Sequence, residues 1–258
     1  MAQWYIRTYL CDNGVEDKTK FPVPDGELPR KIGNRKRASA LRRAEKGATE
    51  AKHELARLLN CNFSAGKDHH ITLEFDSKGF SRLAARAGSR GRDAILFAAD
   101  HELANYIKRC QRQCRKEGVE LRYVYVVADR DGKTGSQKRV HAHIVVNAEA
   151  AEICCRKWNA GHAETSVLYG ERGGDLGDLA FYMIAQVRRI PNRKKYNPSR
   201  NLKKARPMDP VKAKSPEAEL RVPAGCVGIW TAEHRYGRPQ HIRYWRPPGV
   251  EREAEEGP

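Results

Sequence analysis

The stretch VHAHIVV at residues 140–146 constrains the fold of this chain more than any other. Side chains alternate between the two faces of a β-strand, so Ala142 and Ile144 point together into a core. His141 and His143 then share the opposite face, about 7 Å apart by strand geometry. Two imidazoles placed in this way can converge on one cation, although two incidental histidines would give the same short pattern.

A helix predicted at residues 176–189 adds a second set of polar side chains. At about 100° per residue its apolar stripe comprises Leu176, Ala180, Met183, Ile184 and Val187. Tyr182 lies on the other side of the helix, and Gln186 is its neighbour one turn later. Both side chains can therefore reach toward one spot, whereas the alternative is an ordinary half-buried tyrosine.

The composition points to an anionic partner. The chain of 258 residues has a formal net charge of +17 and a pI near 9.7. A surplus of this size favours nucleic acid, although a basic protein of ribosomal type or a solvated basic surface would also carry it. The mean hydropathy is −0.76, and neither a membrane-spanning run nor a signal peptide is recognisable. We therefore expect a cytoplasmic protein with no membrane partner.

The cysteines and the turn at residues 130–135 indicate no further chemistry. Seven cysteines form an odd set without a C-x-x-C pair, so disulfides and a zinc knuckle are not expected. Gly132-Lys133-Thr134 resembles part of a phosphate-binding loop, but Val127 stands where the first glycine of that motif belongs. We therefore do not predict a nucleotide site in this turn.

The order of predicted elements indicates an α+β protein. The expected strands and helices are strand 3–10, helix 38–59, strand 70–75, helix 93–117, strands 121–129 and 139–147, helix 149–157, strand 162–169 and helix 176–189, with a Gly- and Arg-rich loop up to about residue 92. This order predicts a ferredoxin-like, palm-like central antiparallel sheet with helices packed on it.

The chain is predicted to have three parts. Residues 1–60 form a basic N-terminal arm and a helix, and residues 61–207 form the central domain with a basic tail. Residues 208–258 form a C-terminal extension with a small β-hairpin at about 225–246 and a disordered acidic end from Glu251.

The basic tail is a candidate surface for single-stranded DNA. Nine Lys and Arg residues lie between Arg188 and Arg206, with one tyrosine among them. Phosphate contacts combined with an aromatic side chain suit single strands, although a disordered basic linker has the same composition. The candidate DNA-binding residues are Arg189, Arg193, Lys194, Lys195, Tyr196, Arg200, Lys203 and Lys204.

Together these segments resemble the HUH endonucleases, and in their order the phage- and plasmid-type replication-associated initiators. Residues 62–75 are similar to the first motif of that family, residues 140–147 to the second and residues 179–186 to the third. Residues 199–204 are similar to the basic segment that follows, so that the resemblance covers about residues 61–207. Ala185 departs from the pattern, because relatives usually have a lysine three residues after the tyrosine.

The resemblance implies a rolling-circle replication initiator that nicks single-stranded origin DNA. Tyr182 would be the nucleophile, and the products would be a 5′-phosphotyrosine and a free 3′-OH. His141 and His143 would hold Mg²⁺ or Mn²⁺. Gln186 is the preferred third ligand and Asp129 the alternative, since a carboxylate suits these ions better than an amide.

The wider setting also follows from the resemblance. A host helicase and a host polymerase would be partners, and the setting would be the cytoplasm of a bacterium that carries a phage, prophage or plasmid. An HUH transposase or relaxase with a single tyrosine is the nearest alternative. A non-catalytic basic nucleic-acid-binding protein is the alternative from another class. Tyr169 and Tyr196 are competing nucleophiles, but only Tyr182 lies on a helix anchored in the core.

Overall fold

The computed structural model describes residues 2–29, 48–215, 219–233 and 239–252. The basic stretch at residues 30–43, the start of the helix predicted at 38–59 and the acidic end at 253–258 lie outside the described residues. The chain divides into two compact units. Unit 1 comprises Met1–Ala38, Gly170–Asp175 and Lys203–Pro258, and unit 2 comprises Ser39–Tyr169 and Leu176–Leu202.

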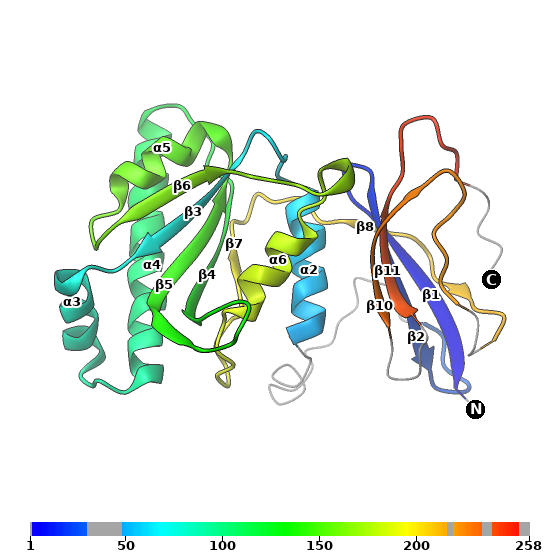
Figure 1. The fold of residues 1–258 in the computed structure, drawn as a ribbon, viewed down its shortest axis with the longest axis horizontal. Coiled ribbons are helices and arrows are strands. Elements are labelled where there is room, and N and C mark those ends of the chain that lie inside the picture. Colours follow the sequence, from blue (N-terminus) through cyan, green and yellow to red (C-terminus); the bar gives the residue numbers. More distant parts are fainter. Residues whose placement is uncertain (1, 30–47, 216–218, 234–238, 253–258) are drawn as a thin grey trace. The chain divides into compact units, whose positions relative to one another are not determined.

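The predicted α+β class is confirmed. The described residues form five α-helices and two antiparallel sheets. The sheet of unit 2 has the strand order β6-β3-β5-β4-β7 (Figure 1). Its strands are β3 (His69–Glu74), β4 (Tyr123–Arg130), β5 (Gln137–Val146), β6 (Ala163–Val167) and β7 (Asn197–Pro198).

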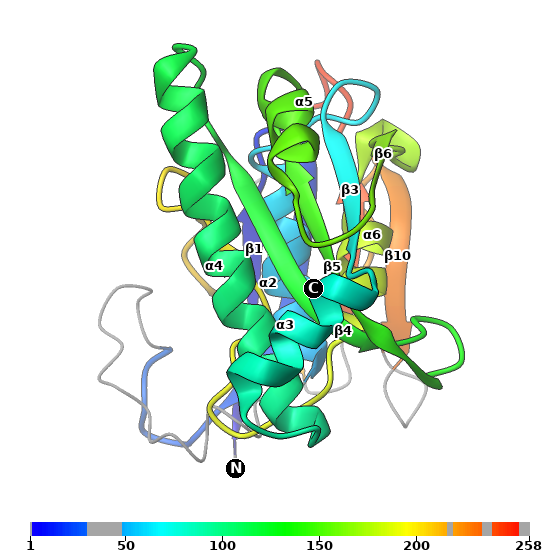
Figure 2. The same cartoon turned by 90° about the vertical axis from the view of Figure 1, so that its left-hand side faces the viewer.

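Helices cover both faces of this sheet. The helices on the first face are α3 (Ser77–Ala87), α4 (Arg92–Lys116) and α5 (Ala148–Lys157), and Figure 2 shows α4 running along the sheet. Their core includes Ile71, Ala142 and Ile144. On the second face, α2 (Ala48–Asn60) and α6 (Gly177–Ala185) pack against Val126 and Val145. Alternation along β4 and β5 thus supplies two cores from one sheet.

Helix α3 lies where a loop is predicted. Its first turn is capped by Asp76, whose side chain accepts a hydrogen bond from the Gly79 N–H, and its last turn ends at Gly88 with φ 60°. Gly79 lies so close to the backbone of Ala160 that a Cβ would overlap it. Glycines favour a loop in the sequence analysis. In the structure Gly88 ends the helix, and Gly79 allows the close approach to Ala160.

Helix α6 ends at Ala185, four residues earlier than predicted. The N–H that would bond the carbonyl of Val187 belongs to Pro191, which has none. The carbonyl of Gln186 instead accepts the N–H of Asp129, at 3.3 Å. The residue that follows the helix is thereby attached to strand β4.

Unit 1 has a sheet of its own, with the order β10-β11-β2-β1-β8 and β9 paired to β1. Its strands are β1 (Gln3–Leu10), β2 (Val15–Val23), β8 (Arg206–Pro207), β9 (Val211–Lys212), β10 (Val227–Glu233) and β11 (Pro239–Trp245). The predicted N-terminal arm and the predicted C-terminal extension are thus parts of one sheet, because β2 pairs with both β1 and β11.

Strand β2 is absent from the sequence prediction, in which Pro22 and Pro24 break the chain. Pro22 pairs with Trp4 of β1, whereas β11 pairs with β2 only over residues 15–19. At Pro22 the strand therefore has a neighbour on one side alone, and a missing N–H is tolerated there. The predicted hairpin at 225–246 is present as β10 and β11.

A buried carboxylate organises one end of this sheet. Glu16 of β2 is 2% exposed and accepts hydrogen bonds from the Tyr244 hydroxyl, Arg246 Nε and Arg252 Nε, each at 2.9 Å. Burial acts to raise the pKa of Glu16, but the hydrogen bonds from Arg246, Tyr244 and Arg252 outweigh it, and the pKa lies below its usual value.

Candidate active site

Strand β5 presents its two histidines together, as the alternation predicts. His143 pairs with Thr72 of β3 and His141 pairs with Glu74, so these four side chains share one face of the sheet. His141 is 9% exposed and His143 3%. Their rings are 4.9 Å apart at an interplanar angle of 89°. The face they occupy is opposite to that of Ala142 and Ile144, which lie in the core.

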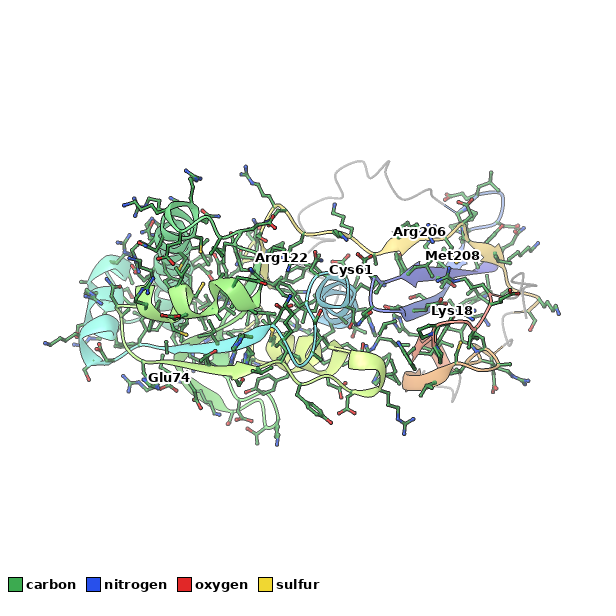
Figure 3. All side chains as sticks on the ribbon, turned by 90° about the horizontal axis from the view of Figure 1, so that it is seen from above. Lys18, Cys61, Glu74, Arg122, Arg206 and Met208 are labelled. Carbon is green, nitrogen blue, oxygen red and sulfur yellow. The ribbon has the colours of Figure 1, made fainter. Side chains whose placement is uncertain are left out.

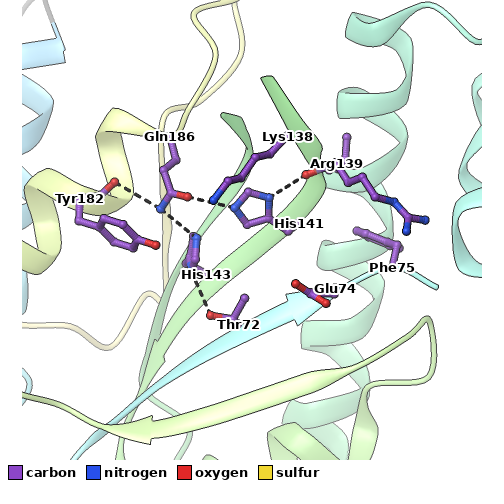
Figure 4. Close-up of a pocket in the computed structure, with 10 residues that line it drawn as sticks. Thr72, Glu74, Phe75, Lys138, Arg139, His141, His143, Tyr182 and Gln186 are labelled. Carbon is purple, nitrogen blue, oxygen red and sulfur yellow. Dashed lines mark hydrogen bonds between the residues drawn. The ribbon is translucent and has the colours of Figure 1, made fainter. Parts of the chain in front are cut away.

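Gln186 joins the two histidines (Figure 4). Its Oε1 is 3.1 Å from Nε2 of His141, and its Nε2 is 2.9 Å from Nε2 of His143. Gln186 is 1% exposed and follows the last turn of α6. The structure therefore brings the three preferred metal ligands into one contact group.

The hydrogen bonds of this group leave a surplus of lone pairs. Nδ1 of His141 donates to the carbonyl of Arg139 at 2.8 Å, so in a ring that carries one proton Nε2 is an acceptor that faces another acceptor, Oε1 of Gln186. On the other side of the amide, Nε2 of His143 accepts a hydrogen bond from Nε2 of Gln186. Rotating the amide by a half turn would place Oε1 against this second acceptor, so the conflict would only move to His143. Two acceptors in contact are stabilised by a cation between them, and adjacent ligands of an octahedral Mg²⁺ lie about 3 Å apart. The donor set thus fits a divalent cation.

His70 orients His143 from the neighbouring strand. Nε2 of His70 is 3.1 Å from Nδ1 of His143, and the Thr72 hydroxyl is 3.4 Å from the same atom. Nδ1–H of His143 therefore has acceptors, which leaves Nε2 as the ligand atom. Burial lowers the pKa of His143 to about 3 and that of His70 to about 4. Both rings are neutral at pH 7, which is the form that binds metal.

Tyr182 lies beside the histidines on the surface of α6. It is 41% exposed, whereas its neighbours Met183 and Ile184 are buried. Its ring centroid is 5.5 Å from that of His143. The helix is fixed by its apolar stripe and by the bond from Asp129 to Gln186, so the Tyr182 side chain is held on a rigid support.

A pocket of about 330 Å³ opens over these side chains. The residues that line it are Thr72, Glu74, Phe75, Lys138, Arg139, Val140, His141, His143, Tyr182 and Gln186. Glu74 is exposed, and Figure 3 shows it at the surface of the sheet. The pocket thus combines a phenol, two imidazoles, a carboxylate and two cationic side chains.

Asp129, the alternative ligand, does not line this pocket. Its carboxylate is fully buried and accepts from Arg92 Nε at 2.5 Å, while Arg92 Nη2 donates to the Asp129 carbonyl at 2.7 Å. Nη1 of Arg188 lies 3.9 Å from the same carboxylate. In this arrangement Asp129 neutralises arginines and, through its N–H, anchors the end of α6.

The candidate DNA-binding residues differ in their surroundings. Those with exposed side chains are Arg189, Lys194 and Arg200 in unit 2 and Lys203 and Lys204 in unit 1. Lys195 is half-buried. Lys203 pairs with Asp12 at 2.8 Å within unit 1.

Two members of the set serve the packing of unit 2. Arg193 is bound by both carboxylate oxygens of Asp100, at 2.7 and 3.0 Å, and its side chain is 2% exposed. The Tyr196 hydroxyl donates to Glu54 at 3.4 Å, and burial raises the pKa of Tyr196. The first part of the basic tail is therefore attached to the domain, which the linker alternative does not predict.

Sequence analysis missed His70, Glu74 and Lys138 as members of this site. The signal for the first two was available, because residues 69–74 alternate as cleanly as residues 140–146. Pairing β3 with β5 in register places His70, Thr72 and Glu74 on the histidine face. The pairing of β3 with β5 is a tertiary contact, and the pattern within one strand does not predict it.

Unit 1 contains a further pair of side chains of the metal-binding type. Nε2 of His241 is 2.5 Å from Oδ1 of Asp17, and the Thr19 hydroxyl is 3.0 Å from Nδ1 of the same ring. A carboxylate and an imidazole can both bind a metal ion, so this pair could contribute to a cation site.

Comparisons with models of protein families, with curated proteins and with solved structures find no match to the chain. Among the helices of the described ranges, none has the length and apolar character needed to cross a membrane.

Proposed function

We propose that this protein is a metal-dependent nicking enzyme of the HUH type that initiates rolling-circle replication through Tyr182. The observation that carries the proposal is the convergence of Tyr182, His141, His143 and Gln186 on one pocket. These residues come from a strand and from the end of a helix at least 39 positions later in the sequence, and each would have the role that the family resemblance gives it.

The topology supports the same family. The strands β3, β4, β5 and β6 follow the chain order, whereas their order in the sheet is β6-β3-β5-β4. Helices connect β3 to β4 and β5 to β6. This is the arrangement of a ferredoxin-like βαββαβ unit, which is the fold that the HUH nucleases have in common.

His141, His143 and Gln186 are the residues that would hold Mg²⁺ or Mn²⁺. The bound ion would neutralise a non-bridging oxygen of the phosphodiester. Glu74 faces the same pocket and is the carboxylate best placed to join them, in place of Asp129. His70 fixes the ring of His143, so that Nε2 faces the pocket.

Tyr182 performs the covalent step. Its hydroxyl oxygen forms a bond to phosphorus while the bond from phosphorus to the 3′ oxygen breaks. The phenolic proton is released from the site, and the departing 3′ oxygen gains a proton, so that the products are a 5′-phosphotyrosine and a 3′-OH. The adduct conserves the energy of the broken bond, and a host polymerase extends the 3′ end behind a host helicase in the bacterial cytoplasm.

Single-stranded origin DNA would be held by exposed basic side chains. Arg189, Lys194 and Arg200 are exposed on unit 2, and Lys203 and Lys204 are exposed on unit 1. Each phosphate contact adds about 0.7 to the salt slope of binding to a single strand. The affinity should therefore fall steeply with salt, whichever side chains perform the chemistry.

The test is a covalent adduct with single-stranded origin-type DNA in the presence of Mn²⁺. We expect an adduct with the wild type, and its loss in EDTA and in His141→Ala and His143→Ala, with DNA affinity unchanged within a few-fold. Lys204→Ala is the matched control, which should weaken binding and still form the adduct at saturating DNA. An adduct that survives EDTA and both histidine changes would refute the metal site.

A further inference from the structure

The loop between β4 and β5 is organised by one carboxylate. Oδ1 of Asp131 accepts the N–H groups of Lys133 and Thr134, each at 2.9 Å, and the Asp131 N–H donates to the Ser136 carbonyl at 2.8 Å. Oδ2 of Asp131 pairs with Nζ of Lys138 at 2.6 Å. The hydrogen bond from Lys138 and those from the two backbone N–H groups hold the pKa of Asp131 well below its usual range. The loop therefore has a fixed shape although it lies on the surface.

This loop contacts the proposed nucleophile directly. A Cβ at Gly132 would lie 2.9 Å and 3.0 Å from Cδ2 and Cε2 of Tyr182, and 3.2 Å from Cγ of Gln186. Side chains larger than hydrogen do not fit there without displacing the ring. The backbone of the loop therefore forms one wall against which the Tyr182 ring rests.

Lys138 carries a positive charge into the same pocket. It lines the pocket with Tyr182, His143 and Gln186, and Figure 4 shows its side chain beside Gln186 and His141. Helix α6 has no basic residue of its own, so the ammonium beside Tyr182 comes from strand β5. The hydrogen bond to Asp131 raises the pKa of Lys138, which keeps the ammonium charged. Its partner Asp131 leaves two of the three N–H donors of the ammonium for another anion.

We propose that Lys138 binds a non-bridging oxygen of the attacked phosphodiester beside Tyr182, and that Asp131 and Gly132 hold the ammonium and the tyrosine ring in position. This inference rests on the proposed function. In the step itself the Tyr182 oxygen bonds to phosphorus and the 3′ oxygen departs, while Lys138 keeps its proton and stabilises the added charge on the phosphate. Lys138 would be a catalytic residue, and Asp131 and Gly132 would be positioning residues.

The first experiment measures the single-turnover rate of adduct formation at saturating single-stranded DNA with Mn²⁺. Loss of one preorganised donor to a transition-state oxyanion slows an enzyme by about 10²- to 10³-fold, and we expect Lys138→Ala to fall in this range. Lys138→Arg should restore most of the rate, and DNA affinity should change by less than about three-fold, because one phosphate contact is lost among several. Lys133→Ala, on the same loop and outside the pocket, is the control and should keep the wild-type rate.

The second experiment follows the Tyr182 ring without DNA. In protein labelled with 3-fluorotyrosine, the ¹⁹F signal that disappears in Tyr182→Phe belongs to Tyr182. Gly132→Ala should shift this signal and leave the others in place, whereas Lys133→Ala should leave all of them in place. An unmoved Tyr182 signal in Gly132→Ala would overturn the role of the loop.

The two proposals fail in different ways. A wild-type protein that forms no adduct overturns the proposed function, and the role of Lys138 with it. A wild-type protein that forms the adduct at a rate unchanged by Lys138→Ala overturns the role of Lys138 alone. A slowed Lys138→Ala that Lys138→Arg restores supports both.

Discussion

Arg193 offers a sharp test of whether the basic tail is part of the fold or part of the DNA-binding surface. Its guanidinium makes three hydrogen bonds, to Oδ2 and Oδ1 of Asp100 at 2.7 and 3.0 Å and to the Val127 carbonyl at 2.9 Å. The side chain of Arg193 is 2% exposed and that of Asp100 is 26% exposed. The contacts join the tail to both α4 and β4.

The structure sets the size of the effect. Removing one partner of a buried ion pair destabilises a protein by about 3–5 kcal/mol. Because water reaches a quarter of Asp100, we expect Arg193→Ala to lower the unfolding free energy by about 2–4 kcal/mol. Lys194→Ala is the matched neighbour, exposed to solvent, and should change the unfolding free energy by less than about 0.5 kcal/mol.

Urea unfolding and DNA titration together decide the matter. We expect Arg193→Ala to lose stability and Lys194→Ala to lower the salt slope of single-strand binding by about 0.7. In a double-mutant cycle, Arg193→Ala and Asp100→Ala should be coupled by about 2 kcal/mol, near the upper part of the usual range for residues in contact. An Arg193→Ala protein with wild-type stability and weakened DNA binding would refute the structural role.

Two further predictions concern the metal and the pH. Gln186→Ala should weaken Mn²⁺ binding measured by electron paramagnetic resonance about 10- to 100-fold, whereas Asp129→Asn should leave it unchanged; the reverse result would restore Asp129 as the ligand. The pKa of Glu16 is lowered on folding, so the stability it contributes is present above its ordinary pKa of 4.5 and is lost as the pH falls through the folded value. Glu16→Gln should therefore flatten the dependence of the unfolding free energy on pH below about 5. An unchanged dependence in this pH range would contradict the contribution of Glu16 to stability.

The centre of the site could be predicted from local periodicity. A period of two in residues 140–146 places His141 and His143 on one face, and a period of 3.6 places Tyr182 beside Gln186. Both patterns depend only on neighbours within a few residues. In the structure the two histidines lie 3.1 and 2.9 Å from the Gln186 amide, and the Tyr182 ring centroid lies 5.5 Å from that of His143.

The remainder depended on contacts that a linear pattern does not contain. His70 and Glu74 join the site through the register of β3 with β5, and Lys138 is held there by its ion pair with Asp131 of the hairpin loop. Strand β2 pairs with β1 and also with β11, which is more than 200 residues away in the sequence. Asp129 was the alternative ligand because a carboxylate suits Mg²⁺ or Mn²⁺, and in the structure this carboxylate accepts a hydrogen bond from Arg92.

The surroundings of three tyrosines distinguish Tyr182, the proposed nucleophile, from its two competitors. Tyr169 is 81% exposed after the end of β6, and the hydroxyl of Tyr196 donates to Glu54. Tyr182 is the one of the three that lines the pocket with His141 and His143.

The most direct test is peptide mapping of the trapped protein–DNA adduct by mass spectrometry. After incubation with single-stranded origin-type DNA and Mn²⁺, we predict a nucleotide on the peptide that contains Tyr182, and no adduct with Tyr182→Phe. A nucleotide on Tyr169 or Tyr196, or an adduct that persists in Tyr182→Phe, would contradict the account.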